Sequence, residues 1–481
     1  MIVINERGNE NMHCGYVVKV DKLRKHENAD KLQIATFFGN DTCVGLDVTV
    51  GEVGIYFPSD LQLSEEFCEV NHLCRKKKDG SPDTGYLDPD KRNIKAIKLR
   101  GEKSDGIFCP LSSIAYTGVN LDDINIGNTI DVVNGHEICC KYIPKQNVRH
   151  GHPSNGNKTR KKKVPIAPLF AEHADTEQLA YNLGAFKFGD EIEITLKMHG
   201  TSQRTGYLPV FKGYKRTLWD KILRRDGTPI YDWGYVTGTR RTVLEDFEGG
   251  YYGSNEFREQ HSKFFEGKLW KGEEVYYEVV GFTHTGAPIM ASCNNKKLND
   301  KDFIKQYGEE TVFSYGCSPD GGAEADYHTE NCGAPYLVNG PKSDIYVYRM
   351  TMTNEDGDVV EYTPDFMRYR CEQMGAKVVP TMWKGTIPKS NIPEGVPYCP
   401  TGDEPEFSAG KWIKDKAEQF YDGPDPIGKT HIREGVVVRI INRPKFCAYK
   451  HKNWYFKMLE GLIKDTAEAP DMEEAQEVEV E

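Results

Sequence analysis

The chain has 481 residues, a length typical of two to three domains, and 38% of them are hydrophobic, which is enough for proper cores. No run approaches the roughly 18 consecutive apolar residues of a membrane helix, and residues 1–7 lack the regions of a signal peptide. We therefore expect a globular, cytoplasmic monomer without a membrane partner. None of the 13 cysteines forms a C-x-x-C pair, so neither a zinc module nor a disulfide framework is indicated.

The net charge of −11 at first argues against a nucleic-acid partner, but it is unevenly distributed. Residues 465–481 hold eight acidic and no basic side chains, and the rest of the chain carries only −3. Such a composition predicts an acidic, disordered tail over residues 464–481. A basic run at 157–163, set among Gly, Pro and Asn, indicates either a flexible linker, which we place at 142–166, or a contact with phosphates.

Short β-rich runs separated by turn residues fill the region before the linker. They cover residues 16–20, 33–38, 43–50, 53–57 and 94–99. This spacing predicts a small β-barrel domain over residues 1–141. Residues 26–32, HENADKL, resemble the signature of OB-fold tRNA-binding modules, which hold nucleic acid in a basic groove; a polar turn between two strands is the alternative.

After the linker the pattern becomes mixed. We expect one helix over residues 174–183 and another over 364–374, the latter with Thr363 as its cap, Pro364 in its first turn and Gly375 just past its end. The stretch 283–344, rich in Gly, Asn, Asp and Cys, is expected to be a surface insertion. The other motif-bearing segments have the composition of strands.

Lys197 follows the alternating run 191–194 and precedes His199 and Gly200, so a strand delivers a lysine to a glycine turn. Taken alone, this short pattern is more often a surface lysine. Downstream, Glu278 sits within the aromatic and β-branched strand 274–281, where a carboxylate is costly to bury unless something uses it. The strand at 345–350 carries aromatic residues that could offer a flat face to a base, or could be ordinary core residues.

Two further features lie near the C-terminal end. Glu434 and Gly435 directly precede an apolar strand that ends at residue 440. Lys450 and Lys452 lie two residues apart in the next expected strand, 446–456, and therefore point to the same face. Two ammonium groups on one face repel each other unless an anion lies between them, and a triphosphate is the obvious candidate.

This ordered set resembles motifs I, III, IIIa, IV and V of the covalent nucleotidyl transferases. The K-x-H-G form around Lys197 and the K-H-K-N segment from Lys450 are similar to RNA ligases more than to DNA ligases. Together with the OB-like module, they resemble the nick-sealing RNA ligases of the Deinococcus type. The resemblance implies an α+β protein in which an N-terminal OB-like β-barrel precedes a nucleotidyl transferase (adenylation) domain over 167–463, built on antiparallel sheets with flanking helices.

The order of domains favours the same subgroup. DNA ligases and mRNA capping enzymes carry their OB domain after motif V, whereas only 29 residues follow Lys452 here. We therefore expect an RNA ligase rather than a DNA ligase or a capping-type enzyme, both of which remain alternatives. A non-catalytic OB-fold RNA-binding protein is the alternative from another class, although Lys197, Glu434 and both motif V lysines are present.

The resemblance implies an ATP-dependent ligase that joins 3′-OH and 5′-phosphate RNA ends, in RNA repair at nicks or breaks. Lys197 would take AMP from ATP, pass it to the 5′-phosphate, and the 3′-hydroxyl would then displace AMP. Mg²⁺ or Mn²⁺ is the implied metal, with Glu434 as its ligand, because carboxylate oxygens are hard donors. Lys450 and Lys452 would stabilise the phosphates.

The remaining roles also follow from the resemblance. His199 and Gly200 belong to the nucleotide site, Glu278 would accept the ribose hydroxyl, and Tyr348 would stack on adenine. Arg240 or its neighbour Arg241 falls at the expected motif Ia arginine, and we assign Arg240. The chain departs from many RNA ligases at Leu196, where they carry a glutamate that helps to recognise adenine. Arg204 is a further candidate, with a solvated loop position as its alternative.

Overall fold

The computed structural model describes residues 13–77, 80–143, 164–174, 176–223, 225, 227–240, 242–244, 246–247, 255–281, 283, 289, 298–309, 343–388, 408–427 and 432–466, and the strand backbone at 326–328 and 336–339. Most of the predicted linker, its basic run, Arg241 and most of the predicted tail lie outside these residues. The chain divides into two compact units, Met1–Gln146 with Trp454–Ala467, and Asn147–Asn453 with Glu468–Glu481. In the described part of the chain, no helix is long and apolar enough to cross a bilayer.

The first unit is built from short strands. They are β1 (Gly15–Lys19), β2 (Leu23–Lys25), β3 (Leu32–Phe37), β4 (Asn40–Gly45), β5 (Val53–Phe57), β6 (Leu61–Leu63), β7 (Ile97–Leu99), β8 (Glu102–Ser104), β9 (Ile107–Pro110), β10 (Thr129–Ile130), β11 (Val132–Val133), β12 (His136–Glu137) and β13 (Cys139–Lys141). Helices α1 (Glu65–Val70) and α8 (Trp454–Thr466) and the 3-10 turns η1 (Leu111–Thr117) and η2 (Leu121–Asp123) complete it.

These strands pair antiparallel in separate sheets, the largest in the order β10-β1-β5-β9 and the next β2-β3-β4. The predicted closed barrel is therefore not seen among the described strands. Their apolar residues enclose one core, which includes Ile55, Phe57 and Phe67. Residues 26–32 form the turn between β2 and β3, where the buried His26 ring bonds the Leu99 carbonyl through Nε2 at 3.0 Å.

Helix α8 is the contribution of the C-terminal region to the first unit. Its residues Tyr455, Phe456 and Leu459 are buried, and Lys457 Nζ lies 2.8 Å from Oδ2 of the buried Asp105. The strand predicted over 446–456 thus ends at Lys452, and a helix begins at Trp454.

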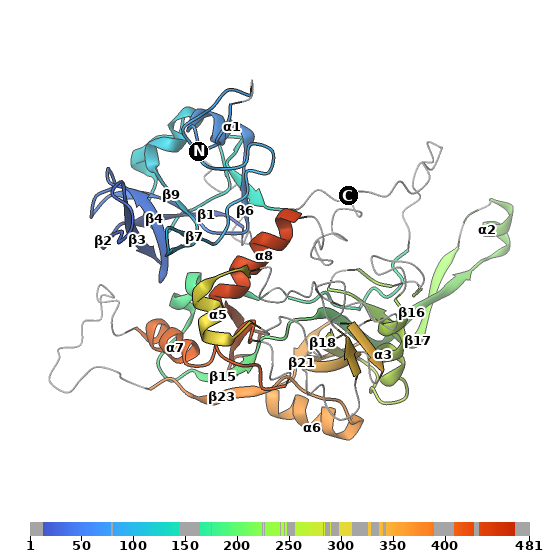
Figure 1. The fold of residues 1–481 in the computed structure, drawn as a ribbon. Coiled ribbons are helices and arrows are strands. Elements are labelled where there is room, and N and C mark those ends of the chain that lie inside the picture. Colours follow the sequence, from blue (N-terminus) through green and yellow to red (C-terminus); the bar gives the residue numbers. More distant parts are fainter. Residues whose placement is uncertain are drawn as a thin grey trace. The chain divides into compact units, whose positions relative to one another are not determined.

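The second unit contains two five-stranded sheets. Its elements are β14 (Glu177–Gln178), the 3-10 turns η3 (Leu179–Tyr181) and η4 (Leu183–Ala185), β15 (Glu191–Leu196), β16 (Thr201–Lys215), α2 (Leu218–Ile222), β17 (Thr228–Gly238), α3 (Glu256–Phe264), β18 (Glu273–Gly281), α5 (Lys301–Tyr307), β19 (Asp326–His328), β20 (Tyr336–Asn339), β21 (Ser343–Thr353), β22 (Val359–Glu361), α6 (Pro364–Met374), β23 (Thr381–Thr386), α7 (Ala409–Glu418), β24 (Gly435–Ile440) and β25 (Ala448–Lys452). Figure 1 shows these elements as a ribbon, with β15 and β23 on one side and the longer strands β16 and β17 on the other.

One sheet has the order β14-β25-β24-β15-β23 and the other β17-β16-β18-β21-β22. All pairs in both sheets are antiparallel except β14 with β25. The predicted mixture of antiparallel sheets and flanking helices is therefore confirmed. Separate apolar cores lie on the two sheets, one with Ile192, Val436 and Ile413, the other with Val275, Val347 and Met367.

One of the two predicted helices is present in the structure and the other is not. The helix at 364–374 is confirmed as α6, with the Thr363 side chain accepting a hydrogen bond from the Phe366 amide and Gly375 in the left-handed conformation at φ 71°. The helix predicted at 174–183 is wrong. There Gln178 pairs with Lys450, and the side chain of Asn182 donates to the Gln178 carbonyl, which a helix would need for its own backbone bond.

Candidate active site

Lys197 lies where the chain passes from one five-stranded sheet to the other. Strand β15 buries Ile192, Ile194 and Leu196, an alternation that fixes its register between β23 and β24. Residues 197–200 then lead directly into β16 of the second sheet. The amide of Lys197 donates to the Gly435 carbonyl at 3.0 Å, so β24 holds the lysine backbone in place.

A buried carboxylate gathers two lysines and a histidine at this crossing. Lys197 Nζ lies 2.6 Å from Glu434 Oε1, and Lys452 Nζ lies 3.7 Å from the same oxygen. His199 Nδ1 lies 3.4 Å from the other oxygen, Oε2. The Glu434 side chain is only 4% exposed, whereas that of Lys197 is 22% exposed. The lysine amine is thus partly open to solvent while its carboxylate partner is not.

The charges around Glu434 decide its protonation state. Burial by itself would raise the pKa of this carboxyl group, but Lys197, His199 and Lys452 outweigh burial and hold it well below its ordinary value. Glu434 is therefore an anion throughout the physiological pH range. This buried anion, its two lysine neighbours and His199 form a charge cluster in which the lysines can exchange the carboxylate for another anion or the carboxylate can recruit a metal.

Backbone contacts hold Gly435 and Asn453 in place beside Glu434. Gly435 has φ 150°, and a Cβ there would lie 2.1 Å from the His451 carbonyl oxygen, so only glycine fits. The amide of Asn453 donates to the Glu434 carbonyl at 2.7 Å, and its side chain donates to Asp422 Oδ1 at 2.7 Å. Strands β24 and β25 are thereby locked together beside the charge cluster.

Lys450 lies on β25 opposite Val437, two residues before Lys452. Alternation along the strand places both lysine side chains on the same face of the sheet. This agrees with the arrangement expected from their spacing.

Glu278 approaches the crossing from the second sheet. A Cβ on Gly200 would lie 2.9 Å from Glu278 Cγ and 2.4 Å from the Val279 carbonyl oxygen, so the missing side chain of Gly200 lets the turn pack on β18. Glu278 itself is half-buried, not buried as predicted. It stands opposite Ser202 on β16 and Tyr346 on β21, so these three side chains share one face.

Tyr348 belongs to the same face of the second sheet. Its hydroxyl lies 2.9 Å from Ser202 Oγ, and its ring lies 5.2 Å from the ring of His173. The His173 amide in turn donates to the Arg240 carbonyl at 3.2 Å, which places half-buried Arg240 in the same neighbourhood. An apolar cluster containing Leu196, Met198 and Tyr346 joins this face to the residues that flank Lys197.

Arg204 does not lie on a solvated loop. It is 1% exposed on β16, where it donates to the carbonyls of Thr239 and Phe170 and packs 4.0 Å from the Phe170 ring centroid. Nη1 also lies 3.4 Å from Glu274 Oε1 on β18. Arg204 is thus a structural residue of the sheet interior, and the fully buried acids of strand β18 are Glu273 and Glu274.

Sequence reasoning assigned no role to Asp422, which bonds Asn453 and also the hydroxyl of Tyr307 on α5. Helix α5 lies within the predicted insertion, so one part of that insertion supports the segment that follows Lys452. The sequence did indicate Asn453, because this residue completes the K-H-K-N segment. No local pattern marks Asp422, because its partners Asn453 and Tyr307 both lie more than 30 positions away in the sequence.

The described side chains fit an anionic ligand and a phosphate-bound divalent cation. Among them, no group of three or more His, Cys, Asp and Glu residues is arranged to hold a metal ion alone. Glu434 nevertheless supplies a hard carboxylate oxygen, and Mg²⁺ is commonly held by one or two carboxylates together with substrate phosphates. Lys197 and Lys452 share Oε1 of that carboxylate and could face the same phosphates.

Comparison with known proteins gives information about the fold. No family model matches the sequence, and no curated protein matches it. The structure of Naegleria gruberi RNA ligase with PPi is 13% identical, with a TM-score of 0.52, and the match covers 94% of this chain and 98% of that chain. A glutamate-to-alanine mutant of that RNA ligase with ATP and Mn is 13% identical, with a TM-score of 0.51 and coverage of 92% and 98%. Nearly the whole chain therefore has the fold of an RNA ligase.

Proposed function

We propose that this protein is an ATP-dependent RNA ligase that joins 3′-OH and 5′-phosphate RNA ends through AMP bound covalently to Lys197. The single observation that supports this most is the contact of Lys197 and Lys452 with one oxygen of Glu434, at 2.6 and 3.7 Å. An amine at a strand end, a second lysine and a carboxylate are the groups that nucleotide transfer to lysine requires. The fold shared with a mutant RNA ligase whose structure holds ATP and Mn supports the same proposal.

In the first reaction, the Lys197 nitrogen forms a bond to the α-phosphorus of ATP and the bond from that phosphorus to the pyrophosphate oxygen breaks. The amine loses its proton, and pyrophosphate leaves with the bonding electron pair. Lys452 and Lys450 would bind the phosphate oxygens, on which negative charge develops. Mg²⁺ or Mn²⁺ held by Glu434 and by phosphate oxygens would add positive charge at the same place.

The next two reactions regenerate the enzyme. A 5′-phosphate oxygen of RNA bonds to the α-phosphorus, the N–P bond to Lys197 breaks, and the amine regains a proton. The 3′-hydroxyl then loses its proton and attacks the 5′-phosphorus, and AMP leaves. We assign Glu278 to the ribose and Tyr348 to the adenine face, because both lie on one face of the second sheet, where Glu278 packs against Gly200 and Tyr348 bonds Ser202. His199 and Arg240 complete the proposed nucleotide site.

The finer assignments belong to the proposal as well. We place the enzyme with the nick-sealing RNA ligases of the Deinococcus type, acting in RNA repair as a cytoplasmic monomer, with residues 1–141 as an OB-like module for nucleic acid. The turn at residues 26–32, between β2 and β3, supports the OB-like assignment because it leads into a strand as that signature does.

Transfer of label from ATP tests the proposal. The wild-type protein is incubated with ATP or GTP labelled at the α-phosphate and then run on a denaturing gel. We expect label from ATP alone, its loss in Lys197→Ala, and its retention in Lys212→Ala, which removes an exposed lysine of the same unit. The proposal fails if wild type acquires no label, and a preference for GTP would favour a capping-type enzyme.

Sealing of nicked duplexes then separates RNA ligase from DNA ligase. Substrates carry a 5′-phosphate at the nick and either RNA or DNA on the 3′-OH side. We expect sealing with RNA and little with DNA. Equal sealing of both would contradict the assignment to RNA ligases.

A further inference from the structure

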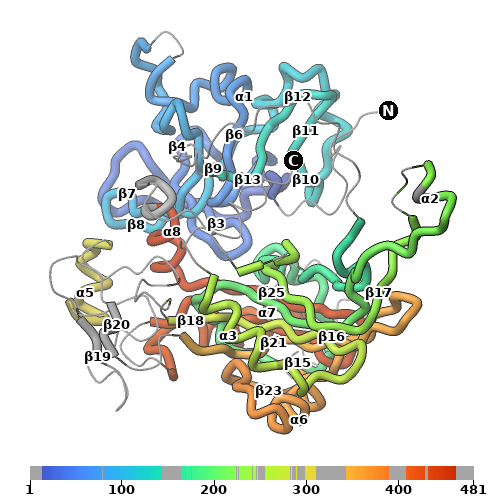
Figure 2. Tube along the Cα trace, turned by 90° about the vertical axis from the view of Figure 1, so that its right-hand side faces the viewer, coloured from blue at the N-terminus to red at the C-terminus, as the bar shows by residue number. Residues whose placement is uncertain are grey.

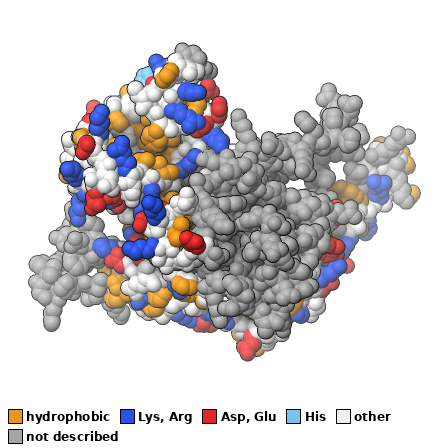
Figure 3. Space-filling view, viewed as in Figure 1, with side chains coloured by type: hydrophobic (Ala, Val, Ile, Leu, Met, Phe, Trp, Pro, Cys, Tyr) orange, Lys and Arg blue, Asp and Glu red, His pale blue; other side chains and the backbone are white. Residues whose placement is uncertain are grey.

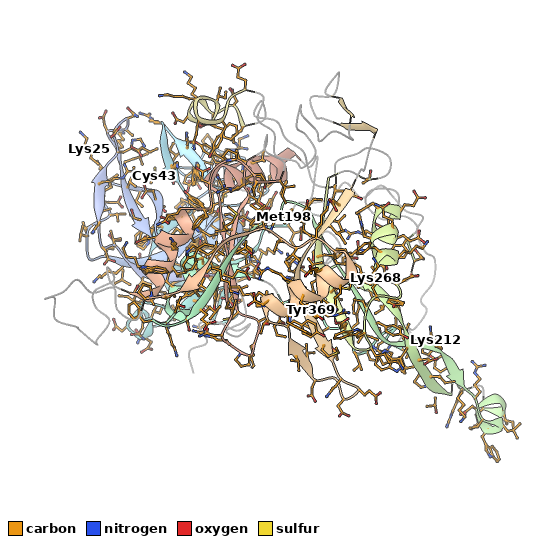
Figure 4. All side chains as sticks on the ribbon, turned by 90° about the horizontal axis from the view of Figure 1, so that it is seen from below. Lys25, Cys43, Met198, Lys212, Lys268 and Tyr369 are labelled. Carbon is orange, nitrogen blue, oxygen red and sulfur yellow. The ribbon has the colours of Figure 1, made fainter. Side chains whose placement is uncertain are left out.

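A β-hairpin projects from the second unit. Strand β16 pairs with β18 only from Thr201 to Gly206, whereas its pairing with β17 continues to Lys215. Beyond Gly206 the described structure is therefore a two-stranded ribbon that ends in helix α2. Figure 2 shows this ribbon running out to α2, and Figure 4 labels Lys212 on its projecting part. We call residues 207–233 the arm.

The tip of the arm exposes large apolar side chains. Leu218, Trp219, Ile222 and Leu223 are 77%, 71%, 68% and 54% exposed. In the described part of the chain, these are among the most exposed large hydrophobic residues, and they lie within six positions of one another. Single exposed apolar residues need no explanation, but such a group is typical of a surface that binds a partner.

Basic side chains accompany the apolar tip. Lys212, Lys215, Arg216 and Arg225 are all exposed on the arm or beside α2. Asp220, the acid within α2, accepts hydrogen bonds at Oδ2 from the amide and hydroxyl of Thr217 at 2.9 and 2.6 Å, so the turn engages this oxygen. Figure 3 shows basic and hydrophobic side chains together at the end of the arm, at the right-hand edge. On a chain with a net charge of −11, this local excess of positive charge is complementary to a polyanion.

Aromatic side chains line the ribbon between the sheet and the tip. Phe211 lies 5.1 Å from Tyr214 and 5.9 Å from Tyr231, measured between ring centroids. Nearer the sheet, Tyr207 packs 5.9 Å from Trp233. These contacts stiffen a two-stranded ribbon that would otherwise be marginally stable. Basic and aromatic residues therefore occur together along the ribbon, a combination that is common in proteins that bind nucleic acid.

We infer that the arm binds the RNA substrate at a distance from the nick, with its basic residues on the phosphates and Trp219 against the sugars of the backbone. The inference rests on the proposed function and deepens it, since it assigns the surface that measures the length of the RNA. A lipid surface or a protein would use the apolar tip alone, whereas the basic and aromatic residues extend back along the ribbon. That continuity favours RNA.

The length of strand β16 sets how far the tip of the arm lies from the start of that strand. Strand β16 begins four residues after Lys197 and has 15 residues, which span about 50 Å at roughly 3.3 Å for each residue. A B-form duplex covers that distance in roughly 15 base pairs, at about 3.4 Å for each pair, and an A-form RNA duplex, which has a smaller rise, needs more base pairs. The tip of the arm can therefore contact an RNA duplex that runs along the ribbon only if the duplex extends at least that far from the nick.

Binding of nicked RNA duplexes with flanks of about 8 or about 24 base pairs tests this length requirement. The full-length double variant Lys215→Glu/Arg216→Glu is compared with wild type and with Lys187→Glu, a charge reversal at an exposed lysine of the same unit outside the arm. We expect the double variant to bind the long duplex at least about tenfold more weakly, with a salt dependence reduced by about two phosphate contacts. Binding of the short duplex and the behaviour of Lys187→Glu should match wild type.

Trp219→Ala provides a second readout. We expect several-fold weaker binding of the long duplex, and in wild type a quenching of tryptophan fluorescence that this variant loses. Labelling of Lys197 by ATP without RNA should be unchanged in every arm variant, which shows that they fold. If wild type acquires no label, the proposed function fails while the duplex measurements still report on the arm.

The inference is overturned if the double variant binds the long duplex as tightly as wild type does, or if it weakens binding of the long and short duplexes by the same factor. It is also overturned if Trp219→Ala instead abolishes binding to anionic phospholipid vesicles, or converts a dimer to a monomer in sedimentation, while RNA binding is unchanged. Those results would assign the apolar tip to a membrane or to a second copy of the chain.

Discussion

Glu274 should make the second unit less stable as pH rises. Its side chain is fully buried on β18, with Oε1 3.4 Å from Arg204 Nη1. Burial raises the pKa of this carboxyl group from about 4.5 to about 7, although Arg204 acts in the opposite direction. Between about pH 4.5 and about pH 7, the Glu274 carboxyl group is therefore protonated in the folded chain, whereas it has released its proton in the unfolded chain.

The sign follows from the raised pKa. The stabilising contribution is fully present below about pH 4.5 and is lost as pH rises through about 7. At about 1.4 kcal/mol for each pH unit between the two values, the loss amounts to about 3 kcal/mol. Glu274→Gln removes the titrating group, retains an acceptor for Arg204 and should abolish this loss.

Urea unfolding at pH 5 and pH 8 measures the effect, with hydrogen exchange of the β18 amides identifying the transition of the second unit. As the pH rises from 5 to 8, the unfolding free energy of Glu274→Gln should increase by about 2 to 3 kcal/mol relative to that of wild type. Glu355→Gln, at an exposed glutamate of the same unit, should show no such gain. If wild type and Glu274→Gln lose stability in parallel as pH rises, the buried carboxyl group is not the cause.

Three further changes address the charge cluster, the glycine beside it and helix α8. Glu434→Gln should keep the fold but slow labelling by ATP by about 100-fold, because the cluster loses its anion; labelling at the wild-type rate would contradict the role of Glu434. Gly435→Ala should lower the unfolding free energy by more than about 2 kcal/mol, since a Cβ meets the His451 carbonyl at 2.1 Å, whereas Gly184→Ala, with open space around it, should not, as thermal unfolding would show. Lys457→Met should destabilise the first unit by about 1 to 3 kcal/mol because it leaves buried Asp105 without its 2.8 Å partner; an unchanged urea midpoint for that unit would show that the pair contributes nothing.

Local patterns predicted the elements whose boundaries depend on nearby residues. Thr363, Pro364 and Gly375 marked both ends of α6, the alternation of apolar residues marked β15, and a continuous apolar run marked β24. The helix predicted at 174–183 failed because a distant strand, β25, pairs with Gln178. The solvated loop position given as the alternative for Arg204 was wrong for a similar reason. Nothing near Arg204 in the sequence indicates that Phe170, Thr239 and Glu274 would enclose it.

The sequence by itself determined the order of the chemical groups: a lysine before a glycine turn, carboxylates in strands and two lysines two residues apart. Strand periodicity alone places Lys450 and Lys452 on one face, so no tertiary information was needed there. Only the tertiary structure decided that Lys197, His199 and Lys452 meet on Glu434, because β15 and β24 are neighbours in a sheet although more than 200 residues separate them. Long-range strand pairing, which no local pattern encodes, brings these groups within 4 Å of the Glu434 carboxylate.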